Sequence, residues 1–217
     1  MHHMKVLNLG IVGVAFAAAT MVLGQGNQEA ANLTREGIEA SKAKDWDKAI
    51  TAFRKAAQLD QHYAPNLASA LQQRATVYVG QKKFQEAVAD YSEALKMKSD
   101  DADIYERRAY AEMQLRDYDK ALNDYNQAIK LSPQEAKYYQ VRALIYQNKG
   151  NLKAALADAE KTLQLDPNNA DAQSRKKFLD AKLHGAPTPV PLPSGPIRNP
   201  NVPPAAAGAG TPAPGKQ

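Results

Sequence analysis

An eighteen-residue stretch recurs along the chain with a fixed period, and this periodicity constrains the fold more than any other feature. The three copies are KKFQEAVADYSEALKMKS at 82–99, RDYDKALNDYNQAIKLSP at 116–133 and GNLKAALADAEKTLQLDP at 150–167, which is a period of 34. The matching residues follow one another at spacings of four and three: Ala87, Tyr91 and Ala94; Ala121, Tyr125 and Ala128; Ala155, Ala159 and Thr162. Such spacings place each set on one face of a helix.

A second helical stripe precedes each copy. Its residues are Leu71, Ala75 and Tyr78, then Tyr105 and Ala109, then Tyr139, Ala143 and Tyr146. Each repeat unit is therefore expected to contain two amphipathic helices. One such pair cannot bury its apolar face alone, whereas stacked pairs share a continuous core, and about three pairs are needed for stability.

A weaker copy lies closer to the N-terminus. Gly37, Trp46, Ala49, Phe53 and Ala56 hold the corresponding places, but the step from Ala49 to Ala87 exceeds the period by four. The extra residues fall in DQHYAPNL, at 60–67. Either one added helical turn or a longer loop would accommodate them without rotating the helix faces.

This pattern resembles the tetratricopeptide repeat family, whose 34-residue helix-turn-helix unit carries W-x₂-L-G-x₂-Y, then A-x₃-F, then P. Four copies are expected, at 30–66, 68–101, 102–135 and 136–169. Pro133 and Pro167 hold the terminal proline place, and Ser99 replaces it in the second copy. The resemblance implies an all-α fold, a right-handed superhelical α-solenoid of four repeats followed by a C-terminal capping helix.

The N-terminal region has a different composition. Residues 6–23 contain no charged side chain and follow Lys5, which is typical of a signal peptide at 1–24, followed by a short linker at 25–29. The alternative is an uncleaved membrane anchor, because eighteen apolar residues are at the lower limit for a spanning helix. The prediction is an exported protein, periplasmic or secreted, that contacts a membrane only if 6–23 remain as an anchor.

The C-terminal region is also distinct. Residues 170–185 are expected to form the capping helix, with Ala172 and Leu179 covering the last repeat, Arg175 facing water and Gly185 ending the helix. Residues 186–217 hold ten of the thirteen prolines, which predicts a disordered tail rich in Pro and Ala. Its segment PTPVPLP suits an aromatic groove, although a flexible spacer is the simpler interpretation.

Composition narrows the function classes. Without Lys5, Arg198 and Lys216 the chain has 25 basic and 23 acidic residues, so a nucleic-acid partner is not expected. The chain has no cysteine, and neither His62 nor His184 has a partner at metal-ligand spacing. No phosphate-binding loop or nucleophile elbow is present. No metal, cofactor or catalytic residue is predicted, and the protein is not expected to be an enzyme.

Opposite charges also recur with the repeat. The arginines are Arg74, Arg108 and Arg142, and the aspartates are Asp90, Asp124 and Asp158. An arginine row could capture an anion, but each arginine lies on a first helix and each aspartate on a second helix. We therefore interpret them as a structural ion ladder, formed within one repeat or with the next. The first copy lacks the pair, because Glu36 and Ala52 occupy these places.

A ligand would bind along the first helices, which line the concave surface of such a solenoid. The stripe beside the core begins at Ser69, Asp103 and Lys137 in the three regular repeats. We expect partner contacts from Gln72, Thr76, Val79, Glu106, Tyr110, Met113, Gln140, Leu144 and Gln147. Tyr110, Met113 and Leu144 are the expected apolar contacts, because Tyr and Met favour interfaces.

The sequence therefore predicts an exported scaffold that holds a peptide or a helix of another protein in this groove. Two alternatives remain, a membrane-anchored subunit that organises an envelope complex and an enzyme without a recognisable motif. One subgroup of the family grips the C-terminal carboxylate of a partner with lysines and asparagines on this stripe. Gln72, Glu106 and Gln140 supply no such cation, so that interpretation is rejected. The pattern does not define the oligomeric state.

Overall fold

The computed structural model describes residues 26–185, and the predicted signal peptide or anchor (1–24) and tail (186–217) lie outside them. The first described helix covers 26–42 and so includes residues expected to form a linker. Its Ala30 is fully buried, so the early part of this helix already packs within the stack. The remaining helices are α2 (Trp46–Leu59), α3 (Ala64–Gly80), α4 (Phe84–Leu95), α5 (Ala102–Gln114), α6 (Tyr118–Leu131), α7 (Ala136–Asn148), α8 (Leu152–Leu165) and α9 (Ala170–His184), with a short 3₁₀ helix η1 (Gln61–Tyr63).

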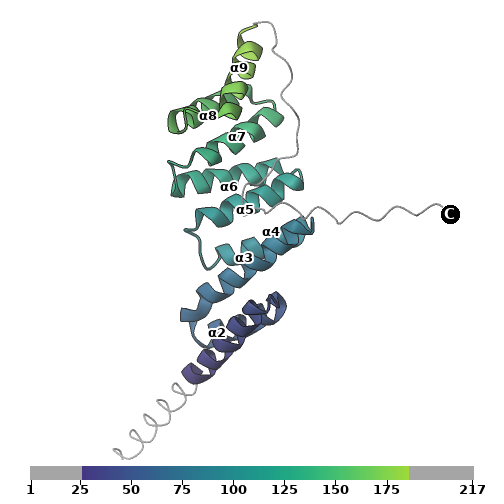
Figure 1. Cartoon of the computed structure of the whole chain (residues 1–217), viewed down its shortest axis with the longest axis vertical. Helices are drawn as coiled ribbons and strands as arrows, with labels where there is room; N and C mark the ends of the chain where they lie inside the picture. The colour runs from purple at the N-terminus through teal and green to yellow at the C-terminus, as the bar shows by residue number, and fades with distance from the viewer. Residues whose placement is uncertain (1–25, 186–217) are drawn as a thin grey trace, which may run out of the picture.

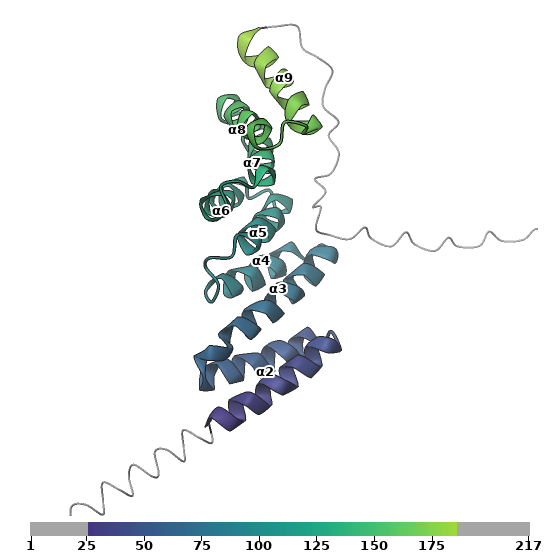
Figure 2. The ribbon, with the colours of Figure 1, turned by 60° about the vertical axis from the view of Figure 1, so that its left-hand side comes forward.

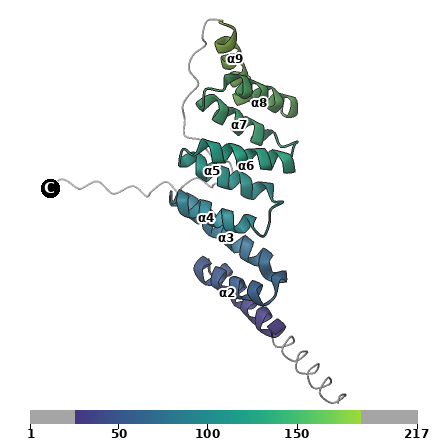
Figure 3. The same cartoon turned by 180° about the vertical axis from the view of Figure 1, so that it is seen from behind.

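The helices stack in chain order, from the 26–42 helix at one end to α9 at the other (Figure 1). Each repeat is a helical hairpin, and its second helix also packs on the first helix of the next repeat. The views from two other sides show the same elongated stack (Figures 2 and 3). Residues 26–185 contain no strand, so the prediction of an all-α helical repeat fold is confirmed.

Polar side chains define where several helices begin. Asp45, Asp117 and Asn151 precede α2, α6 and α8, and each accepts a hydrogen bond from a backbone N–H in the first helical turn. Asp101 and Asn169 cap α5 and α9 in the same way. Such caps satisfy N–H groups that have no partner within the helix.

The turn inside each repeat has one residue in the left-handed region. These residues are Lys44, Lys82, Arg116 and Gly150, with φ of 59°, 61°, 61° and 77°. They occupy equivalent places in the four repeats, and only the fourth repeat has a glycine there. A side chain in this region is strained, because Cβ approaches the following carbonyl oxygen. Three repeats therefore share the same unfavourable turn.

The four-residue insertion lengthens one helix. Helix α3 has 17 residues, whereas α5 and α7 have 13 each, and the additional turn is at its N-terminus. Pro65 lies in the first turn of α3, where a missing N–H is tolerated. Of the two alternatives that the sequence left open, the structure has the added helical turn.

Small residues let the helices approach closely along the stack. Ala49, Ala87, Ala121 and Ala155 occupy equivalent places in the second helices, and all four are fully buried. Gly37 faces Phe53 in the first repeat, and a Cβ at this position would lie 2.6 Å from the ring. The glycine of the family pattern is therefore required where Phe53 packs most closely.

None of the helices within residues 26–185 combines the length and the apolar character that membrane crossing requires.

Candidate functional site

The predicted partner-binding residues lie on α3, α5 and α7, and we call their surface the first-helix face. Three of them are buried: Val79, Glu106 and Met113 are 8%, 5% and 4% exposed. Their prediction as partner contacts is corrected, because successive repeats cover one side of the stripe when they stack. Six remain partly exposed: Gln72, Thr76, Tyr110, Gln140, Leu144 and Gln147.

Several polar side chains on this face already bind within the protein. The hydroxyl oxygens of Thr76 and Tyr91 are 3.2 Å apart. Gln140 donates to Asp171 at 3.3 Å, and Gln147 accepts from Arg175 at 2.6 Å. These amides of α7 therefore position α9, so the polar contacts in the last part of the face are largely internal.

Glu106 is a buried carboxylate in the middle of the face. Its Oε2 lies 3.0 Å from Nζ of Lys137, the first stripe residue of the next repeat. Burial raises the pKa of Glu106, and the ion pair with Lys137 opposes that rise. The Lys137 ammonium also lies 5.2 Å from the centre of the Tyr138 ring. The charge of Lys137 is thus neutralised by Glu106 of the same protein.

A row of side chains at one repeat position runs along the face. Thr76, Tyr110 and Leu144 follow one another at the repeat interval, and Phe178 continues the interval on α9. Ile38 holds the equivalent place in the first repeat and is 40% exposed. We call Ile38, Thr76, Tyr110, Leu144 and Phe178 the central row. Burial raises the pKa of Tyr110.

Ile38 and Phe178 were not predicted as members of this row. The signal was present, because Ala170 follows Ala136 by one period and α9 occupies the place of another first helix. The prediction that Arg175 of α9 faces water is corrected, because its side chain is partly buried and donates to Gln147. Burial lowers the pKa of Arg175. Ala172 and Leu179 are buried, and φ is +73° at Gly185, where α9 ends.

The recurring arginines and aspartates form one pair within each of the second, third and fourth repeats. Arg108 donates from Nε and Nη2 to the two carboxylate oxygens of Asp124, at 2.7 Å each. Arg142 and Asp158 have the same geometry at 2.7 Å, and Arg74 and Asp90 at 2.8 Å. The aspartates are buried, and such bidentate pairs fix the angle between the two helices of a repeat.

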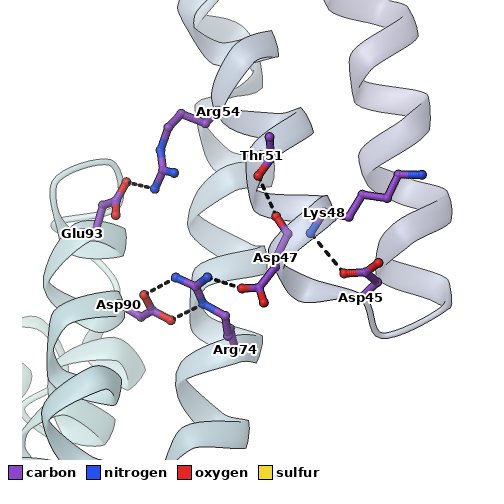
Figure 4. Close-up of polar contacts among 8 residues, drawn as sticks. All are labelled: Asp45, Asp47, Lys48, Thr51, Arg54, Arg74, Asp90 and Glu93. Atoms are coloured by element: carbon purple, nitrogen blue, oxygen red, sulfur yellow. Dashed lines mark hydrogen bonds and ion pairs between the residues drawn. The ribbon is translucent and has the colours of Figure 1, made fainter.

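The third guanidinium nitrogen extends each pair to the preceding repeat. Nη1 of Arg108 donates to Ser92 at 3.0 Å, and Nη1 of Arg142 donates to Asn126 at 2.6 Å. At the N-terminal end Nη1 of Arg74 reaches Asp47 of α2, beside the ion pair of Arg54 with Glu93 (Figure 4). The ladder thus connects repeats as well as helices.

At least one tyrosine ring lies near each of these guanidinium groups. Arg74, Arg108 and Arg142 lie 5.6, 5.8 and 5.5 Å from the ring centres of Tyr78, Tyr105 and Tyr139. Hydrogen bonding to the aspartates raises the pKa of all three arginines, whereas burial raises the pKa of Asp124. The donors are directed into the protein, so the ladder offers no row of free cations to an anion.

Glu112 is a buried acid that the sequence analysis did not identify. It replaces the tyrosine that stands at this place as Tyr78 and Tyr146, and it is 4% exposed. Its Oε2 has no hydrogen-bond partner among the described residues. Burial, reinforced by the nearby Asp124, raises the pKa of Glu112 to about 7. The sequence signal that could have identified Glu112 is its place in the repeat, where the neighbouring repeats have tyrosine.

Among the described residues, no group of three or more acids and histidines could hold a metal ion. The first-helix face presents a row of partly exposed side chains, flanked by amides and internal ion pairs.

Solved structures similar to this chain include two helical repeat domains at 26% identity. One is the TPR domain of Arabidopsis OM64, with a TM-score of 0.51, covering 54% of this chain and 96% of that domain. The other is the first TPR of Spaghetti (RPAP3) bound to the HSP90 peptide SRMEEVD, with a TM-score of 0.51, covering 54% and 93%. A tetratricopeptide repeat protein of Parabacteroides merdae matches at 23% identity, with a TM-score of 0.56, covering 73% and 63%.

No curated protein matched the chain significantly. Three family models, each described as a tetratricopeptide repeat, match residues 37–100, 73–136 and 107–179. Together they cover the four repeats from Gly37 to Leu179, in agreement with the helical hairpins and the period of 34. The chain belongs to the tetratricopeptide repeat family.

Proposed function

We propose that this protein is a non-enzymatic scaffold, and that its first-helix face is the groove that binds a segment of another protein. The central row is the observation that carries the proposal. It places Ile38, Tyr110, Leu144 and Phe178 at one repeat position on four helices, with Thr76 between them. A segment lying across successive first helices would meet an apolar contact at almost every repeat.

The chemistry beside the row favours an apolar or mixed segment. Val79 and Met113 are buried and Glu106 is paired with Lys137, so the face has no exposed cluster of one charge along its centre. Tyr110 and Leu144, both partly exposed, offer apolar area in the middle of the stack. Apolar anchors of this kind commonly supply most of the binding free energy of a peptide.

A similar protein supports the class of partner. The first TPR of Spaghetti (RPAP3), 26% identical, is bound to a peptide of HSP90. We carry over only peptide binding, because the acidic peptide of that complex does not suit the centre of this face. Lys137 is already neutralised by Glu106, and Asp103 lies on the same stripe.

The experiment is co-purification of partners with the full chain and with two matched variants. Tyr110→Ala/Leu144→Ala truncates the central row, whereas Leu59→Ala/Leu131→Ala truncates two exposed leucines on second helices. We expect the first variant to lose at least tenfold of the retained partner, and the second to retain it, with helical circular dichroism unchanged in both. Retention by the first variant and loss by the second would move the site off the first-helix face.

We also propose that the protein is exported and acts in the periplasm or outside the cell. The apolar residues 6–23 after Lys5 support this proposal. The mass of the protein isolated from its host tests it, because secretion predicts a loss of about two dozen residues. An uncleaved chain in the membrane fraction would favour the alternative, an anchored subunit of an envelope complex.

A further inference from the structure

A cavity of about 460 Å³ lies between the first two repeats, and Tyr110 and Leu144 do not line it. Its volume is within the range of about 300–1,000 Å³ that is typical of ligand pockets. The cavity is therefore large enough for several side chains of a peptide.

The inserted turn of α3 builds one wall of this cavity. Pro65 and Asn66 belong to that turn and line the cavity. The later first helices begin at Ala102 and Ala136, without the additional turn. The wall is thus a feature of the first repeat junction alone among the described repeats.

Two aromatic residues of α2, Trp46 and Phe53, line another side. Phe53 is 4% exposed, held against Gly37, whereas Trp46 is partly exposed. The partly exposed Trp46 indole, beside the buried Phe53 ring, is a surface on which proline rings and aliphatic side chains pack well.

Hydrogen-bond donors surround the same cavity. The indole N–H of Trp46 and the side-chain amides of Asn66 and Gln73 make no hydrogen bond to another described residue. In contrast, the Ser69 hydroxyl donates to the carbonyl oxygen of Pro65 at 2.9 Å. Three side chains therefore have donors available for carbonyl groups of a ligand.

The accessible Trp46 indole together with these available donors suits a proline-rich segment. Proline has no backbone N–H, and an extended polyproline II segment presents carbonyl oxygens that need donors. The chain itself contains such a segment, PTPVPLP at 187–193, in which Val190 and Leu192 alternate with prolines. We propose that residues 187–193 of a second copy of this chain bind in the cavity.

The length of the connection favours a second copy over the same molecule. Val190, at the centre of the segment, is five residues after Gly185, a reach of at most about 18 Å. Helices α5 and α7, each about 10–12 Å in diameter, lie between α3 and α9 in the stack (Figure 1). The segment cannot reach its own cavity, whereas the cavity of a neighbouring molecule is accessible.

This contact joins the C-terminal side of one molecule to the N-terminal repeats of the next. Such a head-to-tail contact is heterologous, and it gives open chains unless the rotation happens to close a ring. The interaction does not cover Tyr110 or Leu144 of the first-helix face, and it does not depend on the proposed partner binding.

Trp46 is the only tryptophan of the chain and provides a direct probe. We expect the peptide APTPVPLPSG, residues 186–195, to shift the emission of Trp46 saturably when added to the full chain. The control peptide APTGVGLGSG should leave the emission unchanged. Emission that does not respond to APTPVPLPSG up to about 1 mM would overturn the proposal.

Sedimentation of the purified protein tests the link between copies. We expect the weight-average mass to rise with concentration between about 1 µM and 1 mM, and an excess of APTPVPLPSG to restore the monomer. Trp46→Ala should stay monomeric, as should a variant with Pro189→Gly, Pro191→Gly and Pro193→Gly. Gln73→Ala, at an exposed side chain, should weaken association at least threefold without unfolding.

A mixture of two variants gives the sharpest outcome. The Trp46→Ala variant keeps an intact proline-rich segment, and the variant with three Pro→Gly changes keeps an intact cavity. Only one contact can form between the two, so an equimolar mixture should form dimers and nothing larger. Peptide binding by a protein that stays monomeric at every concentration would contradict a link between copies. Association that survives both variants would show that another surface joins the molecules.

Discussion

Arg108 shows how single side chains determine the geometry of the stack. It holds Asp124 of its own repeat with two hydrogen bonds and Ser92 of the preceding repeat with a third. The guanidinium side chain is 21% exposed and the Asp124 side chain 5% exposed, so removing one partner leaves a largely buried charge. A buried charge without its partner lowers the stability of the protein more than the loss of the attraction itself does.

We predict that Arg108→Ala lowers the free energy of unfolding by about 3 kcal/mol, equivalent to a fall of roughly 6–12 °C in the melting temperature. Arg35→Ala, at an exposed arginine of the first helix, should change it by less than about 0.5 kcal/mol. The double variant Arg108→Ala/Asp124→Ala should lose less than the sum of the single variants. Additive losses in thermal unfolding would show that the pair is not coupled.

Glu112 gives the protein a pH-dependent stability. Its pKa is about 7 in the folded protein, above the ordinary value of 4.5. As the pH rises from 4.5 to 7, the unfolded chain loses this proton before the folded protein does, so the contribution of Glu112 to stability falls. Below pH 4.5 both states are protonated and the contribution is constant.

We predict that Glu112→Gln is more stable than the natural protein at pH 8, by up to about 3 kcal/mol, and nearly equal to it at pH 4.5. Urea unfolding at the two pH values measures the difference. Glu86→Gln, at an exposed carboxylate of α4, should give the same small change at both. A Glu112→Gln effect that is independent of pH would show that the buried acid does not titrate in this range.

At the scale of the helices and turns, the turn between the two helices of a repeat is strained in three of the four repeats. Lys44, Lys82 and Arg116 have positive φ at the place where the fourth repeat has Gly150. A left-handed residue with a side chain is unfavourable by roughly 1–2 kcal/mol, partly offset by the greater freedom of glycine in the unfolded chain.

We predict that Arg116→Gly raises the free energy of unfolding by about 0.5–1 kcal/mol, and that Gly150→Ala lowers it by a similar amount. Gln114→Gly, two residues earlier and still within α5, should instead be destabilising, by about 1 kcal/mol. Thermal unfolding of the three variants separates the effect of φ from that of glycine itself. Loss of stability in Arg116→Gly would contradict a strained turn.

Over the whole molecule, the fold could be predicted from the sequence because each repeat carries the same helical pattern independently of the others. The alanines at 87, 121 and 155 recur where two helices meet, with a tyrosine four residues later in two of the three copies. The extra turn of α3 could not be distinguished from a loop, because Pro65 is compatible with the first turn of a helix as well as with a loop.

The candidate site was less predictable for a physical reason. Helical periodicity identifies the side that faces the paired helix, but a solenoid covers a second side where the next repeat stacks. Val79, Glu106 and Met113 lie on that second side and are buried. Ile38 and Phe178 were not predicted because they lie in the first repeat and on α9, where the repeat pattern is weakest.

The proposed function depends on the first-helix face binding a segment of a partner protein. The most direct measurement places a photo-reactive amino acid at Leu144 in the central row and, as a control, at Leu131 at the end of α6. After irradiation in the native host, mass spectrometry of the products should identify one partner peptide joined at Leu144 and not at Leu131. Cross-links to the same partner from Leu131 alone would contradict the account.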